Sequence, residues 1–405
     1  MRKNPMLAIF TTVFIDLLGF GILIPVFPLL ITDGPFRVTP DGWSFTQGMI
    51  MLGWLQAIYP FCMFIAAPIL GQLSDRHGRR PVLALSIFGT AIGYVLFAIG
   101  ISTGNLPLLF AARGLDGLTG GNLAVAQAAI GDISTHENRA KNFGYMGAAF
   151  GMGFIVGPYL GGKLSSPSVS FYGLFDTPHW FGATTPFWFA AILALLNCTA
   201  VLTTFPETIK EKFHGGKIKV GQSLSNVVNG FKSDRLRIIL VSSFLFSAGF
   251  TFFTTFFGVY LRNKFSFSSS KIGDYFAIVG LCIALSQGLV VGRVAKKLVD
   301  FKVLKFSMFG TGAMMLIYFL TPTTSSMYLY MVIPFFATFN GLCMANTSSL
   351  ISRSAEMGKQ GEAMGIYASV SSLSQVPAAV LVGYITTSIT SSQPLIVASM
   401  CIGLA

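Results

Sequence analysis

The chain has 405 residues, of which 53% are hydrophobic and only 10% are charged. A water-soluble domain cannot bury that much apolar surface, so the composition excludes a soluble globular protein and indicates an integral membrane protein. The formal net charge of +12 is spread over many short loops. It therefore gives no reason to expect a nucleic-acid partner.

Long apolar segments recur along the whole chain. A helix needs about 20 residues to cross a hydrocarbon core about 30 Å thick. The segments are apolar throughout, whereas strands of a membrane barrel alternate apolar and polar residues, so we expect an all-α membrane protein. The twelve predicted transmembrane helices span 7–31, 49–70, 82–101, 106–130, 142–165, 184–206, 236–260, 272–294, 305–321, 325–350, 362–387 and 392–405.

The last span and the central polar stretch bear on domain organisation. At about 1.5 Å per residue the span 392–405 is only about 21 Å long, so the printed sequence is expected to stop before this helix ends. The longest polar stretch, 207–235, divides the chain. We therefore predict a six-helix bundle at 1–206, a cytoplasmic linker at 207–235 and a second, pseudo-symmetric six-helix bundle at 236–405.

The basic residues are distributed unequally between the two sides of the predicted membrane. Of the 27 Lys and Arg residues, 21 fall in loops on the side of the N-terminus, five fall on the opposite side, and Arg113 lies within a span. An excess of Lys and Arg marks cytoplasmic loops. The N-terminus is therefore predicted to be cytoplasmic.

Catalytic and metal chemistry find little support in the sequence. The five Cys all fall inside predicted spans without a CxxC pair, and the four His are scattered. They are typical of packing residues rather than of disulfides or metal ligands. Without a nucleophile–base set or a nucleotide loop, the sequence predicts no enzyme and no cofactor or metal.

The first predicted helix carries Asp16 near its middle. A charge at bilayer depth costs at least about 2.5 kcal/mol, and no Lys or Arg lies within one helical turn. Two interpretations follow: Asp16 binds and releases a proton during function, or hydroxyls such as that of Thr12 hold it as a structural group. We favour the first.

The stretch "GQLSDRHGRRP" (71–81) joins the second and third predicted helices. If this stretch served only to orient the protein in the membrane, it would need its arginines. It would not need Gly71, Asp75, Gly78 and Pro81. Gly71 would allow close approach of helices, and Asp75 could meet a helix N-terminus or an arginine.

This stretch resembles the signature loop of the major facilitator family, G-x-L-S/A-D-R-x-G-R-R-P, at every defined position. In that family the loop latches the two halves of the transporter in the outward-open state. The resemblance implies that an aspartate faces the start of helix 11 and that an arginine faces an acid at the end of helix 4. The implied latch residues are Gly71, Asp75, Arg76, Arg79, Arg80 and Asp132.

Three further stretches resemble patterns of the drug:proton antiporters in this family. They are "LGFGILIPVFP" (18–28), "FAARGLDGLTGGNLA" (110–124) and "GYMGAAFGMGFIVGPYLGG" (144–162). Glycines spaced by three or four form a groove for a neighbouring backbone, and a proline weakens one helical turn. Such residues can also serve only to pack helices. The predicted hinge and packing residues are Pro25, Pro28, Gly153, Gly157, Pro158 and Gly161.

The fourth predicted helix carries two charges, Arg113 and Asp116, three residues apart. Residues at this spacing share a helix face and can form an ion pair. The resemblance implicates Arg113 in proton coupling but expects glutamine at the position of Asp116. Asp116 is therefore either a proton carrier or a structural counter-ion.

The stretch "FIDLLGFGILIPVFP" also resembles helix 1 of tetracycline/proton antiporters, which carries an acid at the Asp16 position. Two departures count against tetracycline itself as the substrate. Gly93 stands where those exporters have an acid in helix 3, and the predicted ninth helix, 305–321, has no acid.

Candidate cavity residues come from polar groups at mid-span and from the run "FTFFTTFF" (250–257). A buried amide needs a partner, either in a neighbouring helix or in a ligand, and aromatic faces bind planar or amphiphilic molecules. Most of the Phe residues are expected to face lipid or neighbouring helices. The predicted cavity contacts are Gln56, Asn122, Gln287, Asn340, Gln375 and Phe253.

These observations favour a proton-coupled secondary transporter that exports a drug-like or amphiphilic small molecule by alternating access. The predicted coupling residues are Asp16, Arg113 and Asp116, and the proton is the coupling ion. We expect a monomer in the bacterial inner membrane, with partners limited to its substrate and the lipid bilayer. Two alternatives are an exporter of one endogenous metabolite, such as a siderophore or a sugar, and a transport-inactive sensor that binds a partner through 207–235.

Overall fold

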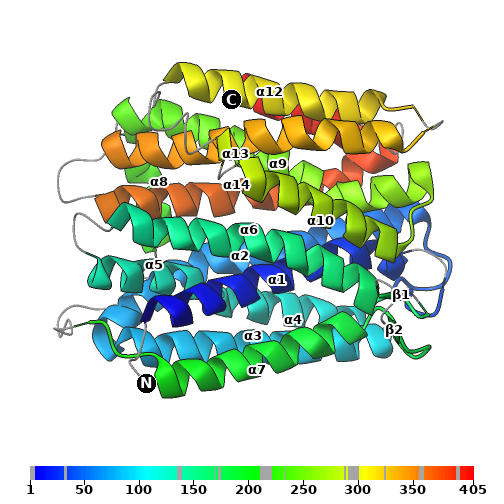
Figure 1. Cartoon of the computed structure of the whole chain (residues 1–405), viewed down its shortest axis with the longest axis horizontal. Coiled ribbons are helices and arrows are strands. Elements are labelled where there is room, and N and C mark those ends of the chain that lie inside the picture. Colours follow the sequence, from blue (N-terminus) through cyan, green and yellow to red (C-terminus); the bar gives the residue numbers. More distant parts are fainter. Residues whose placement is uncertain are drawn as a thin grey trace. The chain divides into compact units, whose positions relative to one another are not determined.

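The structure is a computed structural model and is almost entirely helical (Figure 1). The described residues are 5–31, 34–134, 139–168, 170–171, 175–209, 221–232, 234–286, 289–290, 301–322, 325–354, 360–388 and 393–405. The helices are α1 (Pro5–Ile31), α2 (Phe45–His77), α3 (Arg79–Ser102), α4 (Leu106–Thr119), α5 (Asn122–Ile133), α6 (Arg139–Leu164), α7 (Thr185–Thr204), α8 (Gln222–Lys232), α9 (Asp234–Phe265), α10 (Ser269–Ser286), α12 (Phe301–Leu320), α13 (Met327–Ser354), α14 (Gln360–Ser388) and α15 (Gln393–Leu404).

The helices confirm a multi-pass membrane protein. Within the described residues, nine helices are long and apolar enough to cross a membrane. Each predicted span overlaps helical residues, but the span predicted at 106–130 is divided into α4 and α5. The division falls at Gly120 and Gly121, whose ψ angles of 0° and 1° depart from the helical value.

The glycine pair at this break has a packing reason in α2. A Cβ on Gly120 would lie 2.9 Å from the Tyr59 hydroxyl, and one on Gly121 would lie 3.0 Å from Cα of Ala67. Because α2 comes so close, larger residues do not fit here. The continuous apolar pattern of 106–130 does not reveal this contact, so the sequence predicted one unbroken helix.

The chain divides into two compact units. Unit 1 consists of Met1–Pro40 and Ile58–Gln222, and unit 2 consists of Asp41–Ala57 and Ser223–Ala405. They differ from the predicted bundles because the first part of α2 is grouped with unit 2.

Backbone contacts explain why unit 2 includes this part of α2. A Cβ on Gly53 would lie 2.6 Å from the carbonyl oxygen of Ala379 in α14. Similarly, a Cβ on Gly383 would lie 2.7 Å from the carbonyl oxygen of Met49. Glycines on both helices therefore allow the two backbones to touch.

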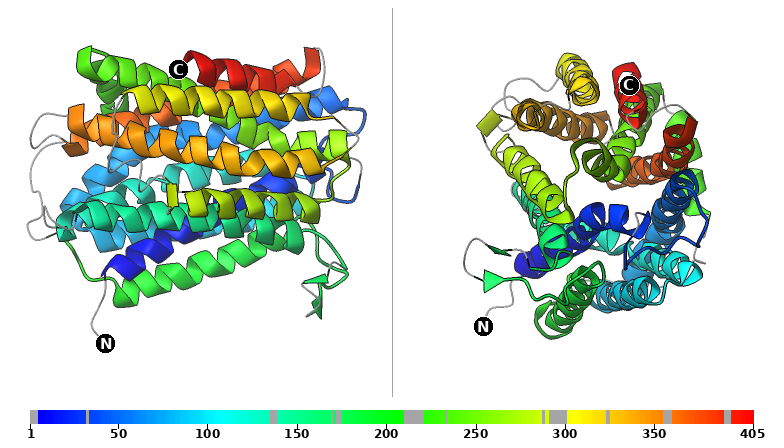
Figure 2. Two further views of the ribbon diagram at one scale, coloured as in Figure 1. Left: turned by 45° about the horizontal axis from the view of Figure 1, so that its top comes forward. Right: turned by 90° about the vertical axis from the view of Figure 1, so that its right-hand side faces the viewer.

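Unit 1 is built around a close contact between α1 and α6, which run side by side (Figure 2). A Cβ on Gly157 would lie 2.6 Å from the carbonyl oxygen of Leu18. One on Gly161 would be equally close to the carbonyl oxygen of Ile22, and one on Gly153 would meet Cβ of Leu17 at 2.5 Å. The glycine groove predicted in 144–162 therefore receives α1, the helix that carries Asp16.

An aromatic cluster forms the core of unit 2. The ring of Phe253 in α9 lies 4.5 Å from that of Phe257, 5.0 Å from that of Phe336 and 6.0 Å from that of Tyr318, measured between centroids. All four side chains are buried. Phe253 was predicted to line a substrate cavity, but its ring is enclosed by other aromatic rings.

The insertion at 166–183 contains a two-stranded antiparallel hairpin, β1 (Ser170–Phe171) and β2 (Phe175–Asp176). Thr177 holds the base of the hairpin, since its hydroxyl donates to the carbonyl of Ser166 at 2.8 Å. Trp180 beyond it is 67% exposed. An exposed tryptophan suits a position in the membrane–water interface.

The α1–α6 contact gives a stability prediction with a matched control in the same helix. Gly157→Ala pushes a methyl group against the backbone of α1, so we expect it to lower the melting temperature of the detergent-purified protein by about 5 °C or more. A Cβ on Gly151 would meet no atom of the described residues within 4 Å. Gly151→Ala should therefore leave the melting temperature within about 2 °C. Equal effects of the two changes would contradict the steric argument.

Candidate functional site

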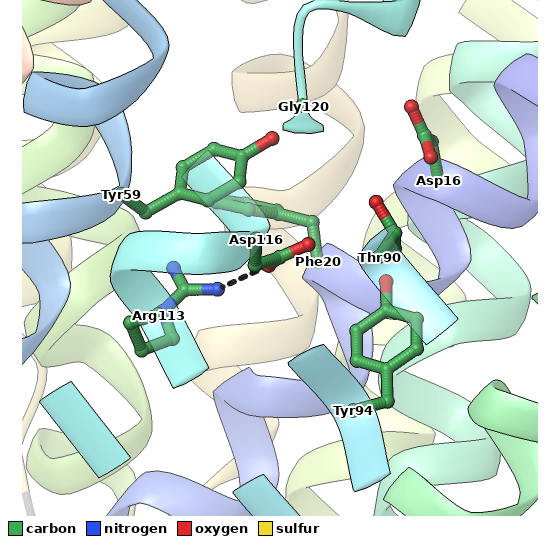
Figure 3. A pocket seen from close by; sticks show the side chains of 8 residues that line it. All are labelled: Asp16, Phe20, Tyr59, Thr90, Tyr94, Arg113, Asp116 and Gly120. Carbon is green, nitrogen blue, oxygen red and sulfur yellow. Dashed lines mark hydrogen bonds and ion pairs between the residues drawn. The ribbon is translucent and has the colours of Figure 1, made fainter. Parts of the chain in front are cut away.

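Three charged groups meet in a small pocket inside unit 1 (Figure 3). Its volume is about 10 Å³, which is room for about one water molecule. Four helices, α1 to α4, contribute side chains, and Gly120 at the break after α4 also lines it. The lining residues are Asp16, Phe20, Tyr59, Thr90, Tyr94, Arg113, Asp116 and Gly120.

The ion pair predicted between Arg113 and Asp116 is confirmed. Nη1 of Arg113 donates to Oδ2 of Asp116 at 3.0 Å, and the two residues are 3% and 7% exposed. The guanidinium carbon lies 4.6 Å from the ring centroid of Tyr59, a cation–π contact. Nε and Nη2 of Arg113 are buried and have no hydrogen-bond partner in the described structure. The guanidinium is therefore anchored by one carboxylate and retains donors for a ligand or water.

Asp16 enters the same pocket from α1, without an ion-pair partner among the described residues. The alternative that Thr12 holds its carboxylate is not supported, because the Thr12 hydroxyl donates to the carbonyl of Ala8 at 2.9 Å. That hydroxyl oxygen in turn accepts from Nδ2 of Asn197 at 3.3 Å. The hydroxyl has a single proton, so none remains for Asp16.

The polar neighbour of Asp16 is Asn122, at the first turn of α5. Asn122 is fully buried, and neither amide atom has a hydrogen bond of normal geometry in the described structure. The helix break after Gly120 places this amide near α1. The pocket therefore combines two carboxyl groups with one guanidinium, leaving one carboxyl group without a counter-ion.

Asp116 packs directly against α3 at Gly93. A Cβ on Gly93 would lie 3.3 Å from Cβ of Asp116, which is tighter than an ordinary contact. The family resemblance expects an acid at the position of Gly93 and a glutamine at the position of Asp116. The structure places these two positions in contact. This seam between α3 and α4 carries one carboxyl group, supplied by α4.

The loop between α2 and α3 forms a second polar site in unit 1. Nε of Arg79 donates to Oδ2 of Asp132 at 2.9 Å, and Nη1 lies 2.6 Å from Oδ1 of Asp75. Nη1 also donates to the hydroxyl of Ser74 at 2.6 Å. We call Ser74, Asp75, Arg79 and Asp132 the Arg79 network. Among the described residues nothing lies within 4 Å of a Cβ built on Gly71, so that part of the chain does not show the close approach of helices predicted there.

The other residues predicted for the latch and the hinges lie within helices of unit 1. Arg76 and Arg80 flank the loop between α2 and α3, and Pro158 lies inside α6. Pro25 and Pro28 lie inside α1, so their rings break backbone hydrogen bonds in its last part.

None of the predicted cavity contacts that the structure describes lines the pocket itself. Gln56 and Asn340 are buried and each has an amide oxygen without a hydrogen-bond partner in the described structure. Gln375 donates to the carbonyl of Ser371, one turn earlier, at 3.3 Å. Gln287 lies outside the described residues. A polar residue at mid-span therefore did not by itself identify the pocket.

The sequence analysis missed four pocket residues: Phe20, Tyr59, Thr90 and Tyr94. Tyr59 follows Gln56 by three residues and so lies on the same side of α2. Tyr94 follows Gly93, where an acid was expected. These spacings offered a signal, but a tyrosine in an apolar helix is indistinguishable from a packing residue until its neighbours are known.

Comparison with known proteins assigns the family. The model of the Major Facilitator Superfamily matches residues 9–403. The chain belongs to the Major Facilitator Superfamily. Its structure resembles that of the human organic anion transporter MFSD10, with a TM-score of 0.73 and 21% sequence identity over 99% of this chain and 97% of that one.

Drug-resistance proteins are among its relatives in sequence. The class B tetracycline resistance protein of Escherichia coli is 33% identical over 73% of this chain and 68% of its own length. The class C protein of Escherichia coli is 29% identical over 94% of this chain and 89% of its own length. Multidrug resistance protein 1 of Bacillus subtilis is 28% identical over 73% of this chain and 66% of its own length.

The ion pair gives a prediction about charge balance. Arg113→Gln leaves two buried carboxyl groups without a cation, which we expect to cost about 3 kcal/mol or more of stability and to reduce the folded yield sharply. Adding Asp116→Asn removes the carboxylate that Arg113 neutralises in the wild-type protein, leaving only Asp16 unpaired as before, and should restore most of that yield. The measurement is the monodisperse fraction in detergent by fluorescence-detected size exclusion.

The control is Lys302→Gln, which removes one positive charge from an exposed position in α12. It should leave the yield unchanged. If the double variant folds no better than Arg113→Gln alone, the pairing of these charges is not what stabilises the pocket.

Proposed function

We propose that the protein is a proton-coupled exporter of drug-like, amphiphilic small molecules. The observation that carries this proposal is the pocket of unit 1, where Asp16 and Asp116 share one cation, Arg113. With both acids ionised the pocket holds one net negative charge. Binding one proton neutralises it, so the charge of the pocket changes with each proton taken up.

Asp16 is the best candidate to carry this proton, because Asp116 is already held by Arg113 at 3.0 Å. An unpaired carboxylate in a membrane gains most from protonation. In transporters of this fold, two bundles rock about a site near the bilayer midplane. Uptake of the proton at Asp16 from outside would favour the inward-facing state, and its release to the cytoplasm would accompany outward movement of the substrate.

The contact between α1 and α6 supports coupling of this pocket to helix movement. Asp16 lies one residue before Leu17, which packs on Gly153, and α6 contains Pro158 in the same contact region. A change of charge at Asp16 would therefore act on α1, whose backbone is in contact with α6. Pro158 leaves one turn of α6 weaker than the rest, which gives that neighbour a place to bend.

The relatives support a drug-like substrate. They include proteins named for tetracycline resistance and for multidrug resistance. The absence of an acid at Gly93 favours a substrate range different from tetracycline alone. We place the protein in the bacterial inner membrane as a monomer with its N-terminus in the cytoplasm.

Energised efflux of a fluorescent cationic dye from pump-deficient bacteria tests the proposal, with tetracycline accumulation measured in parallel. We expect export by the wild-type protein that a protonophore abolishes and that Asp16→Asn reduces to the level of the empty vector. The control variant is Asp41→Asn, since Asp41 is an exposed acid in the loop before α2. It should export at the wild-type rate.

The remaining outcomes separate the alternatives. Efflux that survives Asp16→Asn would assign the proton to Asp116. No efflux of any probe, with the protein verified in the membrane, would contradict a broad drug exporter and favour transport of one endogenous metabolite or a transport-inactive sensor.

A further inference from the structure

The first residues of the predicted linker are docked onto the start of α3. Oε1 of Glu207 accepts the backbone N–H of Arg79 at 2.9 Å, and Oε2 accepts that of Arg80 at 3.3 Å. Glu207 follows the end of α7, almost 130 residues further along the chain. Its carboxylate therefore caps a helix to which it is not adjacent in sequence.

This helix has no cap of its own. The N-cap position is Gly78, with φ of 106°, a conformation that residues with a side chain rarely adopt. Gly78 offers no side-chain acceptor for the first free N–H groups of α3. A Cβ at this position would also clash with the Glu207 carboxylate. Because Gly78 has no side chain, α3 lacks a side-chain cap of its own, and the Glu207 carboxylate has room to bind at this position.

The Glu207 carboxylate is held by more than α3. Oε1 also accepts the backbone N–H groups of Thr208 and Ile209, at 3.0 Å and 3.2 Å. Four N–H groups converge on one carboxylate, next to the positive end of a helix. Hydrogen bonds to an ionised acceptor are stronger than those to a neutral one, and a negative charge is favoured at a helix N-terminus.

The same stretch of linker also reaches the side chains of the Arg79 network. The hydroxyl of Thr208 donates to Oδ2 of Asp132 at 3.0 Å, and this oxygen also accepts from Nε of Arg79 at 2.9 Å. Glu207 therefore binds the backbone of Arg79, while Thr208 binds Asp132, the carboxylate that pairs with the Arg79 side chain. The end of α7 fixes the arginine from two directions.

We infer that Glu207 is a positioning residue for Arg79: it caps α3, keeps the guanidinium in place between Asp75 and Asp132, and attaches the start of the linker to that network. The inference rests on the proposed function, since Arg79 matters for transport through the latch that the family resemblance implies. Glu207 acts through Arg79 and touches neither the substrate nor the pocket residues.

The first test is independent of transport. Amide hydrogen exchange of the detergent-purified protein is followed in overlapping peptides that begin at or before His77 and include Arg79 and Arg80. Glu207→Gln keeps the shape of the side chain but presents an NH₂ group to an N–H group. We expect it to speed exchange of the Arg79 and Arg80 amides about fivefold to tenfold. Thr208→Val is the control, because it removes a side-chain hydrogen bond and leaves the cap intact. Unchanged exchange in Glu207→Gln would overturn the inference.

The second test separates positioning from a general structural role. Initial efflux rates are measured over a range of dye concentrations for Glu207→Gln, Arg79→Gln and the double variant, at equal amounts of folded protein. We expect each single change to lower the maximal rate at least about fivefold with little change in KM, and the double variant to be no slower than Arg79→Gln. Rates that fall multiplicatively in the double variant would show that Glu207 does not act through Arg79.

The two tests also distinguish this inference from the proposed function. If the wild-type protein exports no probe, the proposed function fails, and the exchange rates alone decide whether Glu207 holds the start of α3. If exchange rises while efflux kinetics stay at wild-type values, Glu207 is only a helix cap and the inference is overturned.

Discussion

A charge buried in hydrocarbon has no water to solvate it, and the pocket of unit 1 is organised by this constraint. Arg113 is matched to Asp116 at 3.0 Å and covered by the ring of Tyr59. The single guanidinium cannot neutralise two carboxylates, so Asp16 is left without a counter-ion among the pocket residues. The pair is therefore the neutralised part of the site, and Asp16 is the group that the proposed function assigns to proton binding.

Close helix packing keeps this arrangement in place. Gly157 and Gly161 let α1 lie against α6 with backbone contact, while Gly93 lets α4 approach α3 behind Asp116. Where apolar side chains gain little from leaving lipid, such contacts hold helices together through van der Waals packing. The helix break after Gly120 then turns the Asn122 amide toward the neighbourhood of Asp16. The positions of Asp16 and Asp116 thus depend on packing residues that carry no charge.

The end of unit 1 that is predicted to be cytoplasmic uses polar contacts instead. There Arg79 bridges Asp75 and Asp132, and Glu207 caps the helix that begins at Arg79. Water-accessible ion pairs are individually weak, but a network that shares donors and acceptors holds a definite geometry. The signature loop is therefore one part of a structure that includes the last turn before the linker.

The sequence by itself determined the membrane class, the helical fold, the family and the spacing of Arg113 and Asp116, because hydropathy and i,i+3 geometry are local properties of a helix. It also identified the glycine groove of α6, whose pattern lies within one helix. Only the tertiary structure decided that Asp16 joins that pair, that helix 4 breaks against α2, and that Glu207 lies on α3. Each of these depends on contacts between segments far apart in the chain, and such contacts leave no periodic signal.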